Sequence, residues 1–189
     1  MPLLALPAGG GPPLPESDTI ARYVLDKWAH RGPSFDPGTP ELRAVSNLAA
    51  RTLDTYVSPI QGCLYKQMDA GERATQLASI NAQLDVLEGV LAGGGGRVCG
   101  AARSLADAAL FPTLVFVLDI APAVYGWADP LARRPKLAAH WAEMSEGDAA
   151  GKRVVEEMRG GLAAWFDGDR WKELGIREQV AADPGAFSH

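Results

Sequence analysis

The chain has 189 residues, 47% of them hydrophobic, and a formal net charge of -5 at pH 7. This is enough for one domain with a sizeable core, or for one complete domain and part of another. The acidic balance, with no cluster of Lys and Arg among aromatic residues, argues against nucleic-acid binding. Two cysteines cannot form a disulfide framework, and no spacing of His and Cys suggests a metal site.

The pattern of apolar residues near the N-terminus predicts two short strands and a helix. Residues 3–6 predict a short strand, residues 8–13 form a Gly/Pro-rich turn, and a second strand is expected around Leu14. The spacing of apolar residues from Ser17 to Trp28 predicts an amphipathic helix with Ser17 as its N-cap. A hydroxyl and free backbone N–H groups at the start of a helix are suited to binding a small carboxylate.

Residues 31–40 contain three prolines and two glycines and predict a linker, after which every segment is typical of a helix. Two apolar stripes follow, the first bent at Pro59 and the second ending at the glycines 93–96. The first stripe comprises Leu42, Val45, Leu48, Ala49, Leu53, Tyr56 and Ile60, and the second comprises Leu77, Ile80, Leu84, Leu87 and Leu91.

The next helix begins with Ser104-Leu105-Ala106-Asp107, a capping-box pattern with Asp in place of Glu. Residues 105–121 are apolar almost all round, yet they contain two aspartates and a proline and are shorter than a membrane span of roughly 20 residues. They therefore predict a helix at the centre of a bundle. Further helices are expected from Pro135 and from Asp148, the latter acting as N-cap.

Two motifs, in this order, make the chain resemble the glutathione transferases: Leu14-Pro15-Glu16-Ser17-Asp18-Thr19-Ile20-Ala21-Arg22-Tyr23 and Ser104-Leu105-Ala106-Asp107. The resemblance extends from Pro2 to about Leu174. It implies a mainly α protein, in which a partial thioredoxin-like β-β-α segment (1–30) and a linker (31–40) precede an all-helical C-terminal domain (41–174) and a tail (175–189).

The resemblance also implies a glutathione site. The hydroxyl and backbone N–H of Ser17 would bind the α-carboxylate of the γ-glutamyl group, and Glu16 would face the neighbouring ammonium. Pro2 matches a cis-proline of the family, and the backbone of Met1 would pair with the cysteinyl unit. Taken singly, Ser17 is better explained as an N-cap, Glu16 as a solvated charge and Pro2 as a strand-edge or turn residue; for Ser17 the whole family pattern reverses this preference.

Acceptor contacts would come from the first long helix, where Tyr56 and Ile60 are candidates, although core packing is the favoured role of both residues. No residue is assigned a catalytic role, because a complete family member begins with a strand-helix-strand unit that supplies a Tyr, Ser or Cys to the thiol. Cys63 and Cys99 fall in the helical part and cannot take that role. We therefore expect an N-terminally incomplete chain that binds glutathione weakly or not at all and is inactive as it stands.

The function implied for the complete protein is attack of the glutathione thiolate on a small electrophile, or thiol-disulfide exchange. The alternative is a non-catalytic glutathione transferase-like module for protein-protein assembly, in which Glu16 and Ser17 are remnants. By resemblance we expect a homodimer with glutathione as co-substrate, and no metal, nucleic acid or membrane. The reduced thiols suit the cytoplasm, or equally a plastid.

Overall fold

The computed structural model describes residues 2–7 and 9–189, and the chain forms two compact units, residues 1–35 and 36–189. The boundary falls inside the Pro/Gly-rich segment expected to be a linker. Each unit is described below by itself. Helices dominate the second unit and the only strands among the described residues lie in the first, so the predicted mainly α fold class is confirmed.

The first unit is a two-stranded hairpin followed by one helix. Strand β1 (Leu3–Leu4) pairs antiparallel with β2 (Leu14–Pro15), and α1 spans Ser17–Lys27. Gly9 and Gly11 adopt positive φ in the turn between the strands, which glycine does without steric cost. None of the described residues of this unit is buried, and Leu3 remains 65% exposed. The hairpin and helix therefore have no core of their own.

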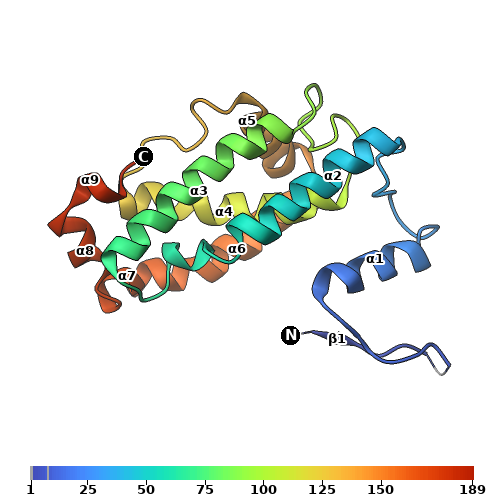
Figure 1. Cartoon of the computed structure of the whole chain (residues 1–189), viewed down its shortest axis with the longest axis horizontal. Coiled ribbons are helices and arrows are strands. Elements are labelled where there is room, and N and C mark those ends of the chain that lie inside the picture. The colour runs from blue at the N-terminus through green and yellow to red at the C-terminus, as the bar shows by residue number, and fades with distance from the viewer. Residues whose placement is uncertain (1, 8) are drawn as a thin grey trace. The chain divides into compact units, whose positions relative to one another are not determined.

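The second unit is a helical bundle (Figure 1). Its longer helices are α2 (Pro40–Thr52), α3 (Ala70–Val90), α4 (Leu105–Tyr125), α5 (Pro135–Ala142) and α6 (Ala149–Asp167). Short turns of other helix types follow some of them, namely the π turns η1 (Leu53–Val57) and η3 (Glu143–Gly147) and the 3-10 turn η2 (Gln61–Leu64). The chain ends in α7 (Arg170–Glu173), α8 (Ile176–Ala182) and α9 (Pro184–Phe187).

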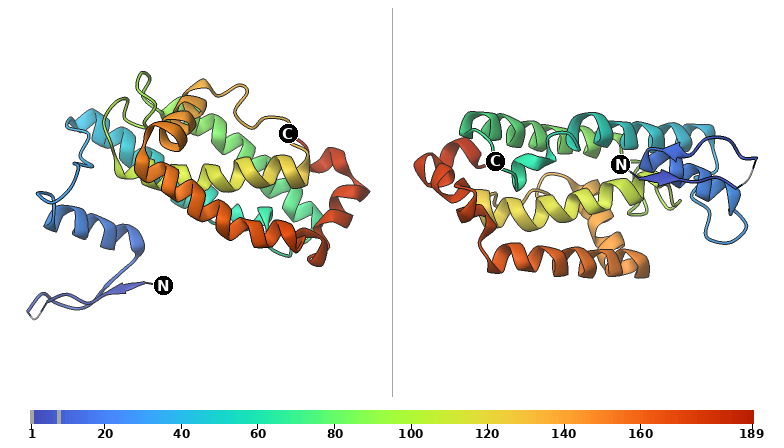
Figure 2. Two further views of the ribbon diagram at one scale, coloured as in Figure 1. Left: turned by 180° about the vertical axis from the view of Figure 1, so that it is seen from behind. Right: turned by 90° about the horizontal axis from the view of Figure 1, so that it is seen from below.

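Helix α4 is the centre of this bundle, as predicted. It lies between the layer of α2 and α3 and the helix α6, a three-layer order seen in Figure 2. By length and composition alone α4 could cross a membrane, but 56% of its most apolar window is buried inside the bundle. The Asp107 carboxylate accepts a hydrogen bond from the Ser104 N–H at 2.7 Å. This confirms one of the two contacts of the predicted capping box, the one from the side chain of Asp107 to the backbone of Ser104.

The apolar stripe of α3 is confirmed, since Leu77, Ile80, Leu84, Leu87 and Leu91 are all buried. The first stripe is partly wrong. Leu48 and Tyr56 are 55% and 57% exposed. Nor does the helix continue to a bend at Pro59, because it changes to the π turn η1 at Leu53, where the Ser58 N–H donates to the Leu53 carbonyl at 2.8 Å.

The extra residue in the π turn accounts for the error at Tyr56. A π turn holds one residue more than an α turn, so it shifts the inward face by about 100° along the sequence. Tyr56, three residues after Leu53, is therefore turned away from the core, while Val57, four residues after Leu53 and inward in either helix type, is buried at 1% exposure.

Residues 175–189, expected as a tail, form α8 and α9 and pack on the bundle. The Trp127 indole N–H donates to the Phe187 carbonyl at 2.8 Å. Gln179 accepts from Arg73 Nε at 2.9 Å and donates to the Met68 carbonyl at 3.0 Å. The C-terminal residues are therefore part of the second unit.

Candidate functional site

The start of α1 differs from the prediction by one residue. Ser17 is not the N-cap; Glu16 occupies that position, with φ 68° and ψ 122°, and no side chain caps the helix. A positive φ at a residue with a Cβ costs on the order of 1–3 kcal/mol. This conformation turns the chain from β2 directly into α1, and Ser17 becomes the first helical residue.

The first turn of α1 is open to a ligand. Ser17, Asp18 and Thr19 are all exposed, and the first hydrogen bond into the helix, from Ile20 N–H to the Glu16 carbonyl at 2.9 Å, comes after them. The uncapped N–H groups of this turn and the positive end of the helix dipole favour an anion. Asp18 opposes an anion less than its charge suggests, because its carboxylate accepts from Arg22 Nε at 2.8 Å.

The hairpin brings the predicted glutathione-binding residues together. Leu3 lies opposite Pro15 and Leu4 opposite Leu14. Pro2 directly precedes Leu3, and Glu16 and Ser17 directly follow Pro15, so these residues flank the paired strands at the same end of the hairpin. All three are exposed. Met1 lies outside the described residues, and so does the peptide bond that joins it to Pro2.

The two predicted acceptor residues belong to the helical unit and face different ways. Tyr56 projects from η1 and is 57% exposed, which leaves it accessible to a ligand or a partner. Ile60 is partly buried and packs against the core. Its contacts support the core-packing interpretation that the sequence left open.

Sequence reasoning missed an aromatic group made by three segments distant in the chain. Tyr65, Phe116 and Trp165 are each partly buried. Their ring centroids lie 5.5 Å apart for Tyr65 and Phe116, 5.2 Å for Tyr65 and Trp165, and 6.5 Å for Phe116 and Trp165. We call these three residues the aromatic patch. Periodicity placed Trp165 inward, and no local signal relates it to Tyr65.

Two arginines that lie over aromatic rings of α5 and α6 are in different electrostatic states. Arg159 donates twice to Asp119, at 2.9 and 2.8 Å, so its charge is compensated. The Arg170 guanidinium lies 4.7 Å from the centre of the Trp165 ring, and its Nε donates to the Tyr65 carbonyl at 3.3 Å. Among the described residues no carboxylate pairs with Arg170.

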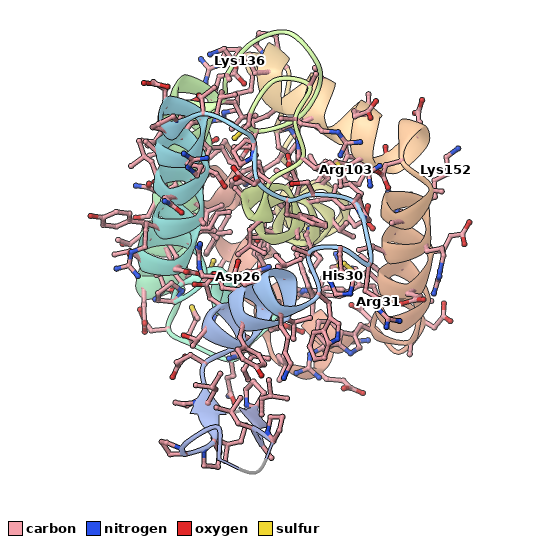
Figure 3. All side chains as sticks on the ribbon, turned by 90° about the vertical axis from the view of Figure 1, so that its right-hand side faces the viewer. Asp26, His30, Arg31, Arg103, Lys136 and Lys152 are labelled. Atoms are coloured by element: carbon pink, nitrogen blue, oxygen red, sulfur yellow. The ribbon has the colours of Figure 1, made fainter. Side chains whose placement is uncertain are left out.

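The charged cluster around Asp148 has a structural role. At the start of α6, Asp148 accepts from Arg97 and Arg103 at 3.0 Å each and caps the helix through Ala150 and Gly151, as its predicted N-cap role requires. Figure 3 labels Arg103 and also Lys152, which lies in the first turn of α6. Within residues 2–7 and 9–189, no three His, Cys, Asp or Glu side chains gather as metal ligands.

The two cysteines offer no reactive thiol. Both are buried and free. Burial raises the pKa of the Cys63 thiol to about 12 and also raises the pKa of Cys99, so both stay protonated near neutral pH. Neither thiol is therefore suited to act as a nucleophile.

Comparisons with known proteins agree with this architecture. The family model for the glutathione S-transferase C-terminal domain matches residues 69–168, more than half of the chain. The crystal structure of maleylpyruvate isomerase from Pseudomonas aeruginosa PAO1 is similar, with a TM-score of 0.59 and 20% identity over 82% of this chain and 79% of that one. No curated protein matches the chain significantly. The chain belongs to the glutathione S-transferase family, and its helical unit contains the C-terminal domain of that family.

Proposed function

We propose that this protein binds glutathione at the start of α1 and serves in the transfer of glutathione to small electrophiles. The observation that carries the proposal is the exposed, uncapped first turn of α1. Ser17 offers a hydroxyl and a backbone N–H there, directly after a Glu16 held at positive φ. Strain of this kind is typical of ligand-binding sites.

The chemistry of this end of the hairpin fits the γ-glutamyl group. Its α-carboxylate would accept from the Ser17 hydroxyl and from the first N–H groups of α1. Its ammonium would pair with the exposed Glu16 carboxylate, and Pro2 at the same end of the hairpin would lie beside the cysteinyl unit. Met1 remains the predicted partner of that unit's backbone.

In the reaction, the glutathione thiolate attacks an electrophilic carbon. A carbon–sulfur bond forms, and the leaving group departs with its electron pair or, in an addition, the acceptor is protonated. If the acceptor is a disulfide, a mixed disulfide forms and a thiolate is released. We assign no residue of this chain to activation of the thiol. The contribution proposed for these residues is binding and orientation.

The acceptor is proposed to bind on the helical unit at the aromatic patch, with Tyr56 as a further contact. Partly exposed aromatic rings bind flat, apolar electrophiles by stacking and by burial of apolar area. The maleylpyruvate isomerase that shares the fold is named for a small-molecule reaction, which supports a small acceptor here.

A role in protein-protein assembly is the second candidate. It is favoured by exposed apolar side chains on the helices α2 and α3 and on η1, namely Leu48, Tyr56 and Val86. These residues would also serve a homodimer. Action in the cytoplasm, or in a plastid, is part of the proposal, since both cysteines are free thiols.

Retardation on a glutathione column, which detects weak binding, tests the proposal. The wild-type protein should elute late, Ser17→Ala should elute with the unretained volume, and Thr19→Ala, which removes another exposed hydroxyl of α1, should behave as wild type. Equal elution of wild type and Ser17→Ala contradicts the proposal. Conjugation of glutathione to 1-chloro-2,4-dinitrobenzene by the wild-type protein would favour an enzyme over an assembly module.

A further inference from the structure

His140 is a buried histidine that the proposed glutathione site does not use. It lies near the end of α5 with no exposed surface, and neither ring nitrogen has a hydrogen-bond partner among the described residues. Its Nδ1 is 3.6 Å from Oδ1 of Asp107, which is too far for a good hydrogen bond. Buried nitrogens without partners are costly, and a change of protonation would change that cost.

Charged groups from three segments face this ring. Burial, the largest effect, and the charge of Arg97 lower the pKa of His140 below its ordinary value of 6.5. Asp107 of α4, Glu143 of η3 and the backbone of Gly96 act in the opposite direction. An imidazolium at this position would therefore attract Asp107 and Glu143, repel Arg97, and lack the water that a charge requires.

The loop that joins α3 to α4 packs against the turn that holds His140. This loop, seen in Figure 1, comprises residues 91–104 and is called the connector below. A Cβ on Gly96 would lie 2.7 Å from the Glu143 Cβ and 3.0 Å from the Ala139 carbonyl oxygen, so the two segments touch directly. Residues 93–96 of the connector are all glycine, and no side chain must be unpacked when they move.

Two polar contacts of the connector involve groups that face His140. The Val98 N–H donates at 2.7 Å to Asp107 Oδ1, the same oxygen that faces His140 Nδ1. Arg97 Nη2 donates to Glu143 Oε1 at 2.9 Å. Protonation would make His140 a charged donor to Asp107 Oδ1 and would place a second cation beside Arg97. Both contacts of the connector would then weaken.

We propose that protonation of His140 opens the connector while the helices of the bundle stay folded, so that His140 acts as a pH sensor for this loop. Opening admits water to the imidazolium and relieves the cost of its burial. The connector is closed at neutral pH, and its open fraction grows as the pH falls below 6.5. Because opening restores the ordinary proton affinity of the ring, the opening equilibrium shifts by at most about tenfold per pH unit.

The two cysteines allow the opening to be measured in the wild-type protein. Cys99 lies in the connector, is 2% exposed, and donates its thiol to the Leu42 carbonyl at 3.2 Å. Cys63 lies in η2 and has no exposed surface, so it reports unfolding of the bundle itself. 4,4′-Dithiodipyridine labels thiols at acidic as well as neutral pH, and peptide mapping separates the two sites.

From pH 7.5 to pH 5.5, labelling of Cys99 should become faster by up to about tenfold, measured relative to the denatured protein at the same pH. Labelling of Cys63 should not become faster. Hydrogen exchange of the wild-type protein provides a second measurement: the Val98 amide should lose protection at pH 5.5, while the amides of α3 keep theirs.

Two histidine variants test the assignment to His140. His140→Gln keeps a polar side chain that cannot be protonated, and it should abolish the pH dependence of Cys99 labelling, whatever the absolute rate. His189→Gln removes the histidine that stacks on Trp127, at 5.2 Å between ring centroids, and should preserve the pH dependence. Unfolding curves identify any variant whose fold has changed.

The inference is overturned if Cys99 labelling does not change between the two pH values, if Cys63 and Cys99 become faster together, or if His140→Gln retains the pH dependence. Equal loss of exchange protection in Val98 and in α3 would also overturn it. These experiments contain no glutathione, so their outcome is independent of whether the start of α1 binds it.

Discussion

Asp107 and His140 face each other inside the helical unit, with 3.6 Å between Asp107 Oδ1 and His140 Nδ1 and almost no exposure of either side chain. Asp107 Oδ1 also accepts from the Val98 N–H at 2.7 Å, and its Oδ2 accepts from the N–H and hydroxyl of Ser104. Neither ring nitrogen of His140 has a hydrogen-bond partner among the described residues. The Asp107 carboxylate thus bonds to Ser104 at the start of α4 and to Val98 in the preceding loop, and it lies next to His140 of α5.

We expect the free energy of unfolding to depend on pH through His140. Burial lowers the pKa of His140 below 6.5, against the opposing effects of the Asp107 charge and the Gly96 backbone; Arg97 lowers it further and Glu143 raises it. Between the folded pKa and 6.5 the unfolded chain binds the extra proton. The free energy of unfolding should therefore be highest above pH 6.5 and fall below it, by at most about 1.4 kcal/mol per pH unit.

Urea unfolding at pH 7.5 and pH 5.5 measures this effect. His140→Phe, which removes the titrating group, should flatten the difference. His189→Ala is the control, because burial also lowers the pKa of His189 and its own contribution must be separated. An unchanged pH dependence in His140→Phe would show that His140 is not the group responsible.

Asp107 should be among the most sensitive residues of the bundle. Asp107→Asn keeps the shape but turns an N–H donor toward the Ser104 N–H or the Val98 N–H, leaving buried donors unpaired. We expect a loss of about 2–4 kcal/mol in the free energy of unfolding. Asp54→Asn, at an exposed position of η1, should change it by less than about 0.5 kcal/mol. Equal effects of the two changes would disprove the assigned role of Asp107.

Arg73 is predicted to anchor the C-terminal helices. It is fully buried, donates to the carbonyls of Cys63 and Lys66, and holds Gln179 of α8. Arg73→Met should cost about 3 kcal/mol or more, because these acceptors lose their donor. Limited proteolysis should then cut near α8 first. Arg51→Met, at an exposed position of α2, should leave both the stability and the cleavage pattern unchanged.

The two thiols should be inert in the folded protein. Because burial raises the pKa of Cys63 to about 12 and raises that of Cys99, neither carries much thiolate at pH 8. Labelling with 5,5′-dithiobis(2-nitrobenzoate) should be slow in buffer and rapid in denaturant. Rapid labelling of the native protein would mean that at least one thiol is accessible and ionised.

Local patterns in the sequence predicted much of the bundle. The stripe of α3 has an unbroken helical period, and the capping residues Asp107 and Asp148 act on groups within a few residues of themselves. Such patterns depend only on residues close in the sequence, so they can be recognised before the tertiary structure is known. The family resemblance implied a glutathione site at Pro2, Glu16 and Ser17; the hairpin places these residues at one end, and binding there remains a prediction.

Other features depend on contacts that no local pattern contains. The π turn at Leu53 moves Tyr56 to the surface, and the apolar spacing there is compatible with either helix type. Glu16 adopts a positive φ, a conformation usually taken by glycine. A glutamate at this position gave no reason to expect that conformation. The aromatic patch joins residues 65, 116 and 165, and the buried Arg73 depends on Gln179, more than 100 residues later.

The most direct test of the central claim is a titration of the 15N-labelled protein with glutathione, followed by the backbone amide signals of Ser17, Asp18 and Thr19. The account predicts that these signals shift in a saturable manner at millimolar glutathione, and that Ser17→Ala weakens the response several-fold while Thr19→Ala preserves it. If the amides of α1 do not respond, or if Ser17→Ala responds as the wild type does, the start of α1 is not a glutathione site.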